Sequence, residues 1–474
     1  MALCHFKFPI VIVMTQSPAK LTQNGANVMR LLRLSLSALL ACLAFVSAAQ
    51  AQLVVDVTEG HLEPLPIAVP DFVGEPGLAS ERGADIARVV AADLASSGLF
   101  APIDDEAFIE RIEDINLRPR FGDWRVINAD ALVVGSVEVM DDGRLLVAFR
   151  LWDTASEQQL TGLRLTSVPE NWRRVAHKLA DAVYERLTGE KGYFDTRIVY
   201  VAESPGDNGI PVRRLAIMDQ DGANPSFLTS RNYMALLPNY SPVSQEITYV
   251  SFRDGHATSF LYDLESGRQE ALFDSGPSLA SEGQSLSARY HPQGHVLAVS
   301  AERQGNHDIF RFDLRTRQLR QLTNSPANDV EPSYSPDGER LVFSSTRGGS
   351  SQLYVMSADG GEAQRITFGE GRYTTPVWSP RGDLIAFTKQ HQGMFSLGVV
   401  RADGSGDERI LYEGFFVDTP AWSPNGRVIL FTRGERRSDG TRYEIWSVDL
   451  AGFNLRRLPT QGQASDPAWS PLIE

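Results

Sequence analysis

The sequence predicts an α/β N-terminal domain followed by an all-β six-bladed propeller, which the C-terminal strand closes. Three observations predict this fold class. A Ser-Pro turn returns at a nearly constant interval through the second half of the chain, only strand patterns follow residue 197, and helix and strand patterns are mixed before it. A repeat of about 40–50 residues is typical of propellers, in which each repeat forms one four-stranded blade.

The recurring turn is clearest at residues 332–338, 376–382 and 420–426, which share the pattern Pro-x-aromatic-Ser-Pro-x-Gly. With three looser copies, the turn prolines lie at positions 242, 292, 336, 380, 424 and 471, at intervals of 44 to 50 residues. Ser-Pro-x-Gly is typical of a type I turn, because proline presets φ at the second position and glycine closes the fourth. We expect the aromatic residue to end one strand and apolar runs such as Leu341–Ser344 to form the next.

The N-terminus has the pattern of a secretory signal peptide that begins at Met29. Residues 1–28 precede this pattern, and we expect them to be a non-native extension, with Met29 as the true start and Met1 as the alternative. A basic start is followed by the apolar run Leu34–Val46 and a small-x-small site, which predicts cleavage after Ala51. At about 13 residues, the apolar run is too short for a membrane span. Residues 1–51 are therefore interpreted as a signal peptide with this extension, and the mature protein is expected to be exported.

The remaining chain divides into an α/β domain at residues 52–190, a linker at 191–196 and the propeller at 197–474. In chain order we expect a strand at Leu65–Val69, a helix through Ile86–Leu94 that Gly98 ends, a helix from Asp104 or Asp105 to Ile112, strands at Ala131–Met140 and Leu145–Trp152, and a helix that Gly189 ends. Apolar residues at helical spacing and the glycine stops predict the helices. A capping box at Ser167–Glu170 is expected to open the last one.

The first blade lacks a Ser-Pro turn of its own. Ile198–Ala202, Leu215–Met218 and Pro225–Thr229 read as three strands, whereas the sixth turn motif is Trp469–Pro471 at the C-terminus. We expect residues of about 464–471 to supply the innermost strand of the first blade. This closure would remove the exposed sheet edges that an open array leaves.

Composition and motifs favour a binding protein over an enzyme or a nucleic-acid binder. The net charge of −14 opposes general phosphate binding, and both cysteines lie in the predicted signal region. The sequence contains no Gly-x-Ser-x-Gly, His-Glu-x-x-His or phosphate-loop motif, so no catalytic residue is assigned. Two alternatives stay open: a secreted hydrolase or lactonase with a metal in the propeller channel, and a propeller that captures small molecules.

Two sets of residues occupy equivalent repeat positions at one end of the channel, which we call the mouth. The basic set follows each second strand: Arg253, Arg303, Arg347, Lys389 and Arg433. The second set, called the ring, lies three residues before each aromatic: Leu237, Ser287, Glu331, Thr375, Thr419 and Asp466. Solvated loop charges and hydrated channel carboxylates are the ordinary interpretations of the two sets. A basic rim beside apolar loops would also suit a docking protein, and the oxygen ligands could hold Ca²⁺.

The sequence resembles the TolB family of the Tol–Pal cell-envelope system. The resemblance rests on the signal peptide with the Gln52–Asp56 start, on Leu94–Phe100, on Leu187–Ile198 and on the repeated turns, and it covers essentially residues 52–474. Ser-Pro-x-Gly repeats alone are shared with other propellers, whereas the junction at Gly189–Ile198 is more specific. The resemblance implies a non-enzymatic periplasmic adaptor that links the inner-membrane Tol complex to the peptidoglycan-associated lipoprotein Pal and supports outer-membrane integrity and cell division.

The resemblance also implies two partner sites on a chain expected to be a monomer without a membrane span. TolA would bind the mature N-terminal segment Gln52, Leu53, Val54, Val55 and Asp56. Pal would dock at the loops entering the innermost strands: Tyr233–Leu237, Gln284–Ser287, Asn328–Glu331, Arg372–Thr375, Phe416–Thr419 and Gln463–Asp466. The residues assigned to this site are Met234, Leu286, Ser287, Asp329, Glu331, Tyr373, Thr375, Asp418, Thr419 and Asp466, with the basic set. Other outer-membrane or peptidoglycan-associated proteins are further candidate partners.

Overall fold

The computed structural model describes residues 53, 55, 63–206, 209–232, 234–253, 256–273, 285–303, 305–438 and 440–473. The predicted signal peptide and its cleavage after Ala51 lie outside the described residues, as do Gln52, Val54 and Asp56. The chain separates into two compact units, Met1–Leu53 and Val54–Glu474. The fold described below is that of the second unit.

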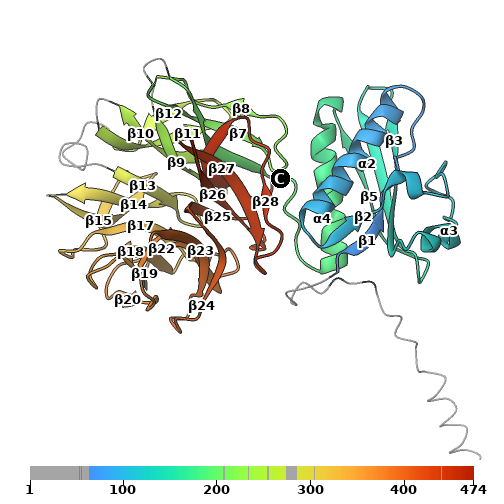
Figure 1. Cartoon of the computed structure of the whole chain (residues 1–474). Coiled ribbons are helices and arrows are strands. Elements are labelled where there is room, and N and C mark those ends of the chain that lie inside the picture. The colour runs from blue at the N-terminus through green and yellow to red at the C-terminus, as the bar shows by residue number, and fades with distance from the viewer. Residues whose placement is uncertain are drawn as a thin grey trace, which may run out of the picture. The chain divides into compact units, whose positions relative to one another are not determined.

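The first part of this unit is a five-stranded sheet with two long helices against it (Figure 1). The strand order is β2-β1-β3-β4-β5, in which β1 runs parallel to β2 and β3 and the other pairs are antiparallel. The strands are β1 (Leu65–Ala68), β2 (Phe100–Pro102), β3 (Ala131–Val139), β4 (Leu145–Asp153) and β5 (Gln158–Ser167). The helices are α2 (Leu78–Ser96), α3 (Phe121–Val126) and α4 (Trp172–Thr188), with 3-10 turns η1 (Asp105–Ala107) and η2 (Pro169–Asn171).

The apolar stripes of α2 and α4 form the helical side of this core. Ile86, Val90 and Leu94 on α2 and Leu179 and Val183 on α4 are fully buried. Gly189 ends α4 in the left-handed region at φ 73°, where glycine carries no Cβ penalty. The two expected long helices, the hairpin strands and both glycine stops are therefore confirmed.

Two local predictions in this domain are wrong. Asp104 caps only the 3-10 turn η1, through a hydrogen bond from the Glu106 N–H to Asp104 Oδ1 at 3.1 Å. No α-helix through Ile112 forms in the described segment, and the unpredicted helix α3 follows instead. Ser167 does not cap α4, because it ends β5 in register with Leu145 while Pro169 opens η2. Ser167 therefore belongs to β5, although the capping-box pattern predicted that it begins a helix.

The described part of residues 197–473 forms six four-stranded sheets, each one blade (Figure 1). From the innermost strand outward, the first blade is β29 (Gln463–Trp469), β6 (Arg197–Ser204), β7 (Val212–Asp219) and β8 (Ser226–Phe227), and the second is β9 (Ala235–Tyr240), β10 (Glu246–Arg253), β11 (His256–Asp263) and β12 (Gln269–Ala271). The third blade is β13 (Ser285–Tyr290), β14 (Val296–Arg303), β15 (Asn306–Asp313) and β16 (Leu319–Gln321), and the fourth is β17 (Asp329–Tyr334), β18 (Arg340–Ser345), β19 (Gln352–Ser357) and β20 (Gln364–Arg365). The fifth blade is β21 (Arg372–Trp378), β22 (Leu384–His391), β23 (Met394–Arg401) and β24 (Glu408–Gly414), and the sixth is β25 (Phe416–Trp422), β26 (Val428–Arg437), β27 (Gly440–Asp449) and β28 (Arg456–Arg457).

The C-terminal strand closes the ring as predicted. β29 pairs antiparallel with β6, with Trp469 opposite Ile198 and Ala464 opposite Ala202. The Trp469 indole donates to Thr196 Oγ1 at 2.8 Å, which joins the chain end to the start of the propeller. Residues far apart in sequence thus complete one blade and satisfy the edge that β6 would otherwise expose.

The Ser-Pro turns have the expected hydrogen bond between their first and fourth residues. Gly338, Gly382 and Gly426 each donate their N–H to the carbonyl of the turn serine at 2.9 Å. Each glycine also has a positive φ, between 69° and 84°, which a Cβ would disfavour. Local turn chemistry therefore ends every innermost strand of these three blades in the same way.

Candidate partner-binding mouth

Strand direction places the two predicted sets at one end of the propeller. Consecutive strands of a blade are antiparallel, so the start of β13 and the end of β14, at Arg303, lie at the same end. The Ser-Pro turns follow the innermost strands and therefore lie at the opposite end. The mouth and the Ser-Pro turns are two separate ends of one channel.

The ring residues sit at β-bulges in the innermost strands. The register shifts beside Leu237, Glu331, Thr375, Thr419 and Asp466. These five residues have φ values between 46° and 58°, and a proline follows each of them. Proline donates no ladder hydrogen bond, so a bulge is the position where an inner strand accommodates it. In β13 the shift lies between Ser285 and Ser287, where the sequence has no proline.

The bulges bring ring side chains into contact with neighbouring blades. The Thr375 N–H donates to Glu331 Oε2 at 2.7 Å, and the Leu237 N–H donates to Asp466 Oδ2 at 3.4 Å. The Thr375 hydroxyl also donates to Asp418 Oδ1 at 3.2 Å. These carboxylates therefore join adjacent innermost strands across the channel wall.

Burial changes the protonation of these carboxyl groups. It raises the pKa of Glu331 to about 7 and that of Asp466 to about 6, with the Asp418 charge adding to both shifts. Burial also raises the pKa of Asp418. Desolvation disfavours the charged form of a carboxyl group, so part of this set holds protons near neutral pH.

The predicted channel calcium stays a prediction. The described residues bring three metal-ligating groups within 4.8 Å of one another at Asp93, His177 and Asp221, which lie outside the mouth. In that group the His177 ring Nδ1 lies 2.6 Å from Asp93 Oδ2. Burial alone would lower the pKa of His177, but the Asp93 carboxylate, with smaller contributions from Asp221 and Asp219, raises the pKa to about 9.

Two members of the basic set are held by acidic partners. Arg347 Nη2 lies 2.8 Å from the fully buried Asp329, and Lys389 Nζ lies 2.7 Å from Glu408. The Tyr373 hydroxyl also donates to Glu408 at 2.6 Å. The structure thus gives Asp329 and Tyr373, both assigned to the mouth, structural contacts inside their own blades. Glu408 was not predicted, because it lies on an outermost strand far from Lys389 in sequence.

The remaining assigned residues differ in exposure. Arg433 lies over the Trp446 ring at 4.4 Å, whereas Arg303 and Met234 are exposed, Met234 by 36%. Ser287 is buried, and the side chains of Arg253 and Leu286 lie outside the described residues. Arg303 and Met234 are therefore the assigned side chains best placed to meet a partner. Their partner-binding role, like that of the other assigned residues, stays a prediction.

Two family models match the chain in order. The TolB amino-terminal domain matches residues 53–160, and the TolB β-propeller domain matches residues 184–473. The chain belongs to the TolB family. The unmatched residues 161–183 cover most of β5 and α4, which connect the two regions of this TolB-family chain.

Individual relatives agree with this family. The chain is 51% identical over 229 residues to the Tol-Pal system protein TolB of Paramagnetospirillum magneticum, a match that spans 48% of this chain and only about half, 51%, of that relative. The crystal structure of TolB from Acinetobacter baumannii superimposes with a TM-score of 0.74 at 28% identity, covering 89% of this chain and all of the other. Both relatives are TolB proteins, in agreement with the family of this chain.

The junction between the two TolB domains contains paired charges and a tight backbone contact. Glu190 forms ion pairs with Arg381 at 3.0 Å and with Arg427. The Asp181 carboxylate accepts the backbone N–H groups of Phe194 at 2.7 Å and Asp195 at 3.0 Å. Residues of α4 and of the propeller therefore both contact the segment Gly189–Ile198, whose sequence supported the resemblance.

Among the described residues, the helices all fall short of the length and apolar character that a membrane crossing requires.

Proposed function

We propose that this protein is a periplasmic adaptor of the Tol–Pal system that links the inner-membrane Tol complex to Pal. In this role it supports outer-membrane integrity and cell division and catalyses no reaction. The observation that carries the proposal is the match of both TolB domains to one chain, in the order of the family. The predicted export signal supports the periplasmic location.

Pal docks at the mouth in this proposal. Met234 and Arg303 place an apolar and a cationic side chain, both exposed, at that end of the propeller. The channel carboxylates are half-buried and already bonded to neighbouring blades. Exposed groups therefore provide the contacts, and the carboxylates hold the blades that position them.

TolA binds the mature N-terminal segment, residues 52–56. Val55 is buried, and its N–H donates to the Leu187 carbonyl in the last turn of α4 at 2.7 Å. This bond satisfies a carbonyl that a helix end leaves without a partner. The apolar residues of the segment suit strand addition to a partner sheet, in which main-chain hydrogen bonds offset ordering costs of about 1–2 kcal/mol per residue.

Isothermal titration of the mature chain, residues 52–474, with the periplasmic domains of Pal and TolA tests the proposal. Arg303→Glu should weaken Pal binding by about 1–2 kcal/mol, or roughly 5- to 30-fold, because it replaces the attraction between the arginine and acidic groups of Pal by repulsion between like charges. Arg315→Glu is the matched control, because this exposed arginine follows β15 at the opposite end. A chain that begins at Val55 should lose TolA but still bind Pal.

The outcomes separate the function from the site. If the unmodified chain binds neither domain, the adaptor function is wrong. If it binds Pal and Arg303→Glu and Arg315→Glu behave alike, the function stands and the mouth assignment is wrong.

A further inference from the structure

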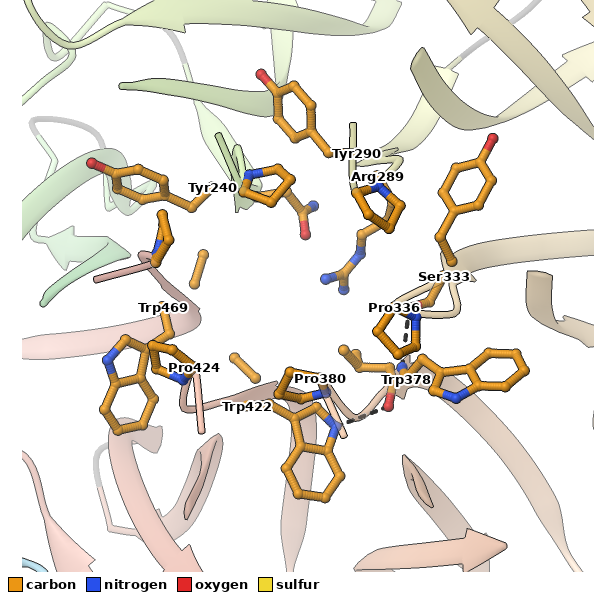
Figure 2. A pocket seen from close by; sticks show the side chains of 18 of the residues that line it. Tyr240, Arg289, Tyr290, Ser333, Pro336, Trp378, Pro380, Trp422, Pro424 and Trp469 are labelled. Carbon is orange, nitrogen blue, oxygen red and sulfur yellow. Dashed lines mark hydrogen bonds between the residues drawn. The ribbon is translucent and has the colours of Figure 1, made fainter. Parts of the chain in front are cut away.

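The end of the channel opposite the mouth contains a cavity with a volume of about 390 Å³. All six blades line it, and the six turn prolines surround it (Figure 2). Pockets that bind small organic ligands have volumes of about 300–1,000 Å³ and are mostly apolar with a few polar groups. This cavity therefore has the size and wall of a small-molecule site.

Among the described side chains that line the cavity, Arg289 is the one charged residue. Figure 2 shows its guanidinium reaching into the hollow between the innermost strands. The equivalent positions, three residues before each turn proline, are occupied by Asn239, Ser333, Val377, Ala421 and Ala468. Aligning the six repeats in the sequence identifies this cation, because the other five positions are uncharged.

The guanidinium of Arg289 has no hydrogen-bond or ion-pair partner within the described part of the chain. Burial lowers the pKa of Arg289 to about 10, so the side chain remains a cation at neutral pH. Glu331 attracts it at longer range, but its carboxylate already accepts the Thr375 N–H at 2.7 Å and has a pKa raised by burial to about 7. The side chain is partly buried, and a partly desolvated cation without a protein partner would be stabilised by an anion in the cavity.

The other lining groups select the kind of anion. Ser333 Oγ accepts the backbone N–H of Trp378 at 3.1 Å. The hydroxyl hydrogen of Ser333 can therefore donate into the cavity. Val377 and Ala421 continue the apolar wall that the prolines begin. Arg289 is the one cation among the described lining residues, so it can balance the single charge of a carboxylate but only half the charge of a dianionic phosphate. A guanidinium pairs well with a planar carboxylate through two parallel hydrogen bonds.

We propose that this cavity is a binding site for a small organic carboxylate. The carboxylate pairs with Arg289 and Ser333, and the apolar part of the ligand packs among the proline rings. The site is separate from the Pal mouth, so it goes beyond the proposed adaptor function and can be tested without either partner.

Ligand titration by calorimetry and NMR tests the site in the mature chain, residues 52–474. The probes are benzoate, its neutral analogue benzamide, and inorganic phosphate. The Trp422 indole N–H donates to the Val377 carbonyl at 2.9 Å in the cavity wall, so its NMR signal reports binding at this place. We expect saturable benzoate binding that shifts this signal, with benzamide and phosphate each at least tenfold weaker.

Arg289→Gln should weaken benzoate at least tenfold while its unchanged indole signals show that the fold is kept. Arg315→Gln, which removes an exposed arginine outside the cavity, should bind benzoate within twofold of the unmodified chain. Equal binding of benzoate and benzamide, tighter binding of phosphate, retained affinity in Arg289→Gln, or no saturable benzoate binding would each overturn the proposal.

Discussion

Replacing Glu331 by glutamine should stabilise the folded chain at about pH 8 and change little at about pH 4.5. Burial raises the pKa of this carboxyl group from 4.5 to about 7, so the folded chain keeps a proton that the unfolded chain releases between these values. The free energy of unfolding therefore falls as the pH rises through this window. At about 1.4 kcal/mol per pKa unit, a shift from 4.5 to about 7 makes the charged carboxylate cost at most roughly 3.5 kcal/mol at high pH.

Glutamine removes that cost and keeps an oxygen to accept the Thr375 N–H. The half-buried position and the lost attraction to Arg289 reduce the gain, so we expect an increase of about 1–2 kcal/mol in the free energy of unfolding at about pH 8. Urea denaturation followed by tryptophan fluorescence at both pH values measures it. The exposed Glu339→Gln is the matched control. A Glu331→Gln chain with equal changes at both pH values, or with lower stability at high pH, would refute the reasoning.

Three further changes test the junction and the closure. Gly192→Ala should lower the free energy of unfolding by about 1–3 kcal/mol in urea, because its Cβ would lie 2.6 Å from the Asp181 Cα; an unchanged midpoint would contradict this close contact. Glu190→Gln should lower the free energy of unfolding by about 1–3 kcal/mol, because it leaves two arginines without their carboxylate partner. High salt screens ion pairs, so it should reduce the difference in unfolding free energy between this variant and the unmodified chain, and a difference that salt leaves unchanged would argue against the pairing. Deleting residues 463–473 should abolish the near-UV circular dichroism of the propeller and expose it to protease, and a protease-resistant product would argue against closure by β29.

The propeller could be predicted because its signal is local and repeated. A Ser-Pro-x-Gly turn specifies its own backbone wherever it occurs, as the bond from the Gly338 N–H to the Ser335 carbonyl shows. Ring closure followed from counting, since the turn at Trp469–Pro471 had no blade of its own. Helix α4 was recognised from its stripe and from Gly189, but its start was not, because β5 extends through Ser167.

The sequence predicted which repeat positions lie at the candidate site, but not the contacts that their side chains make. Equivalent repeat positions located the ring, but its bonds cross between blades, as from Thr375 to Glu331. The sequence could not show that Lys389 faces Glu408, since an inner and an outer strand contribute the two residues. A basic rim was therefore expected where the structure has at least two paired cations. Side-chain pairing depends on the three-dimensional register of neighbouring strands, which the repeat alone does not encode.

Photo-crosslinking from the mouth to Pal tests the central claim most directly. A benzoylphenylalanine replaces the exposed Met234 in one chain and the exposed Arg315, at the opposite end, in another. Each is irradiated with the periplasmic domain of Pal, and the product is mapped by mass spectrometry. The account predicts a crosslink from position 234 and none from position 315. A complex that crosslinks from 315 and not from 234 would contradict it.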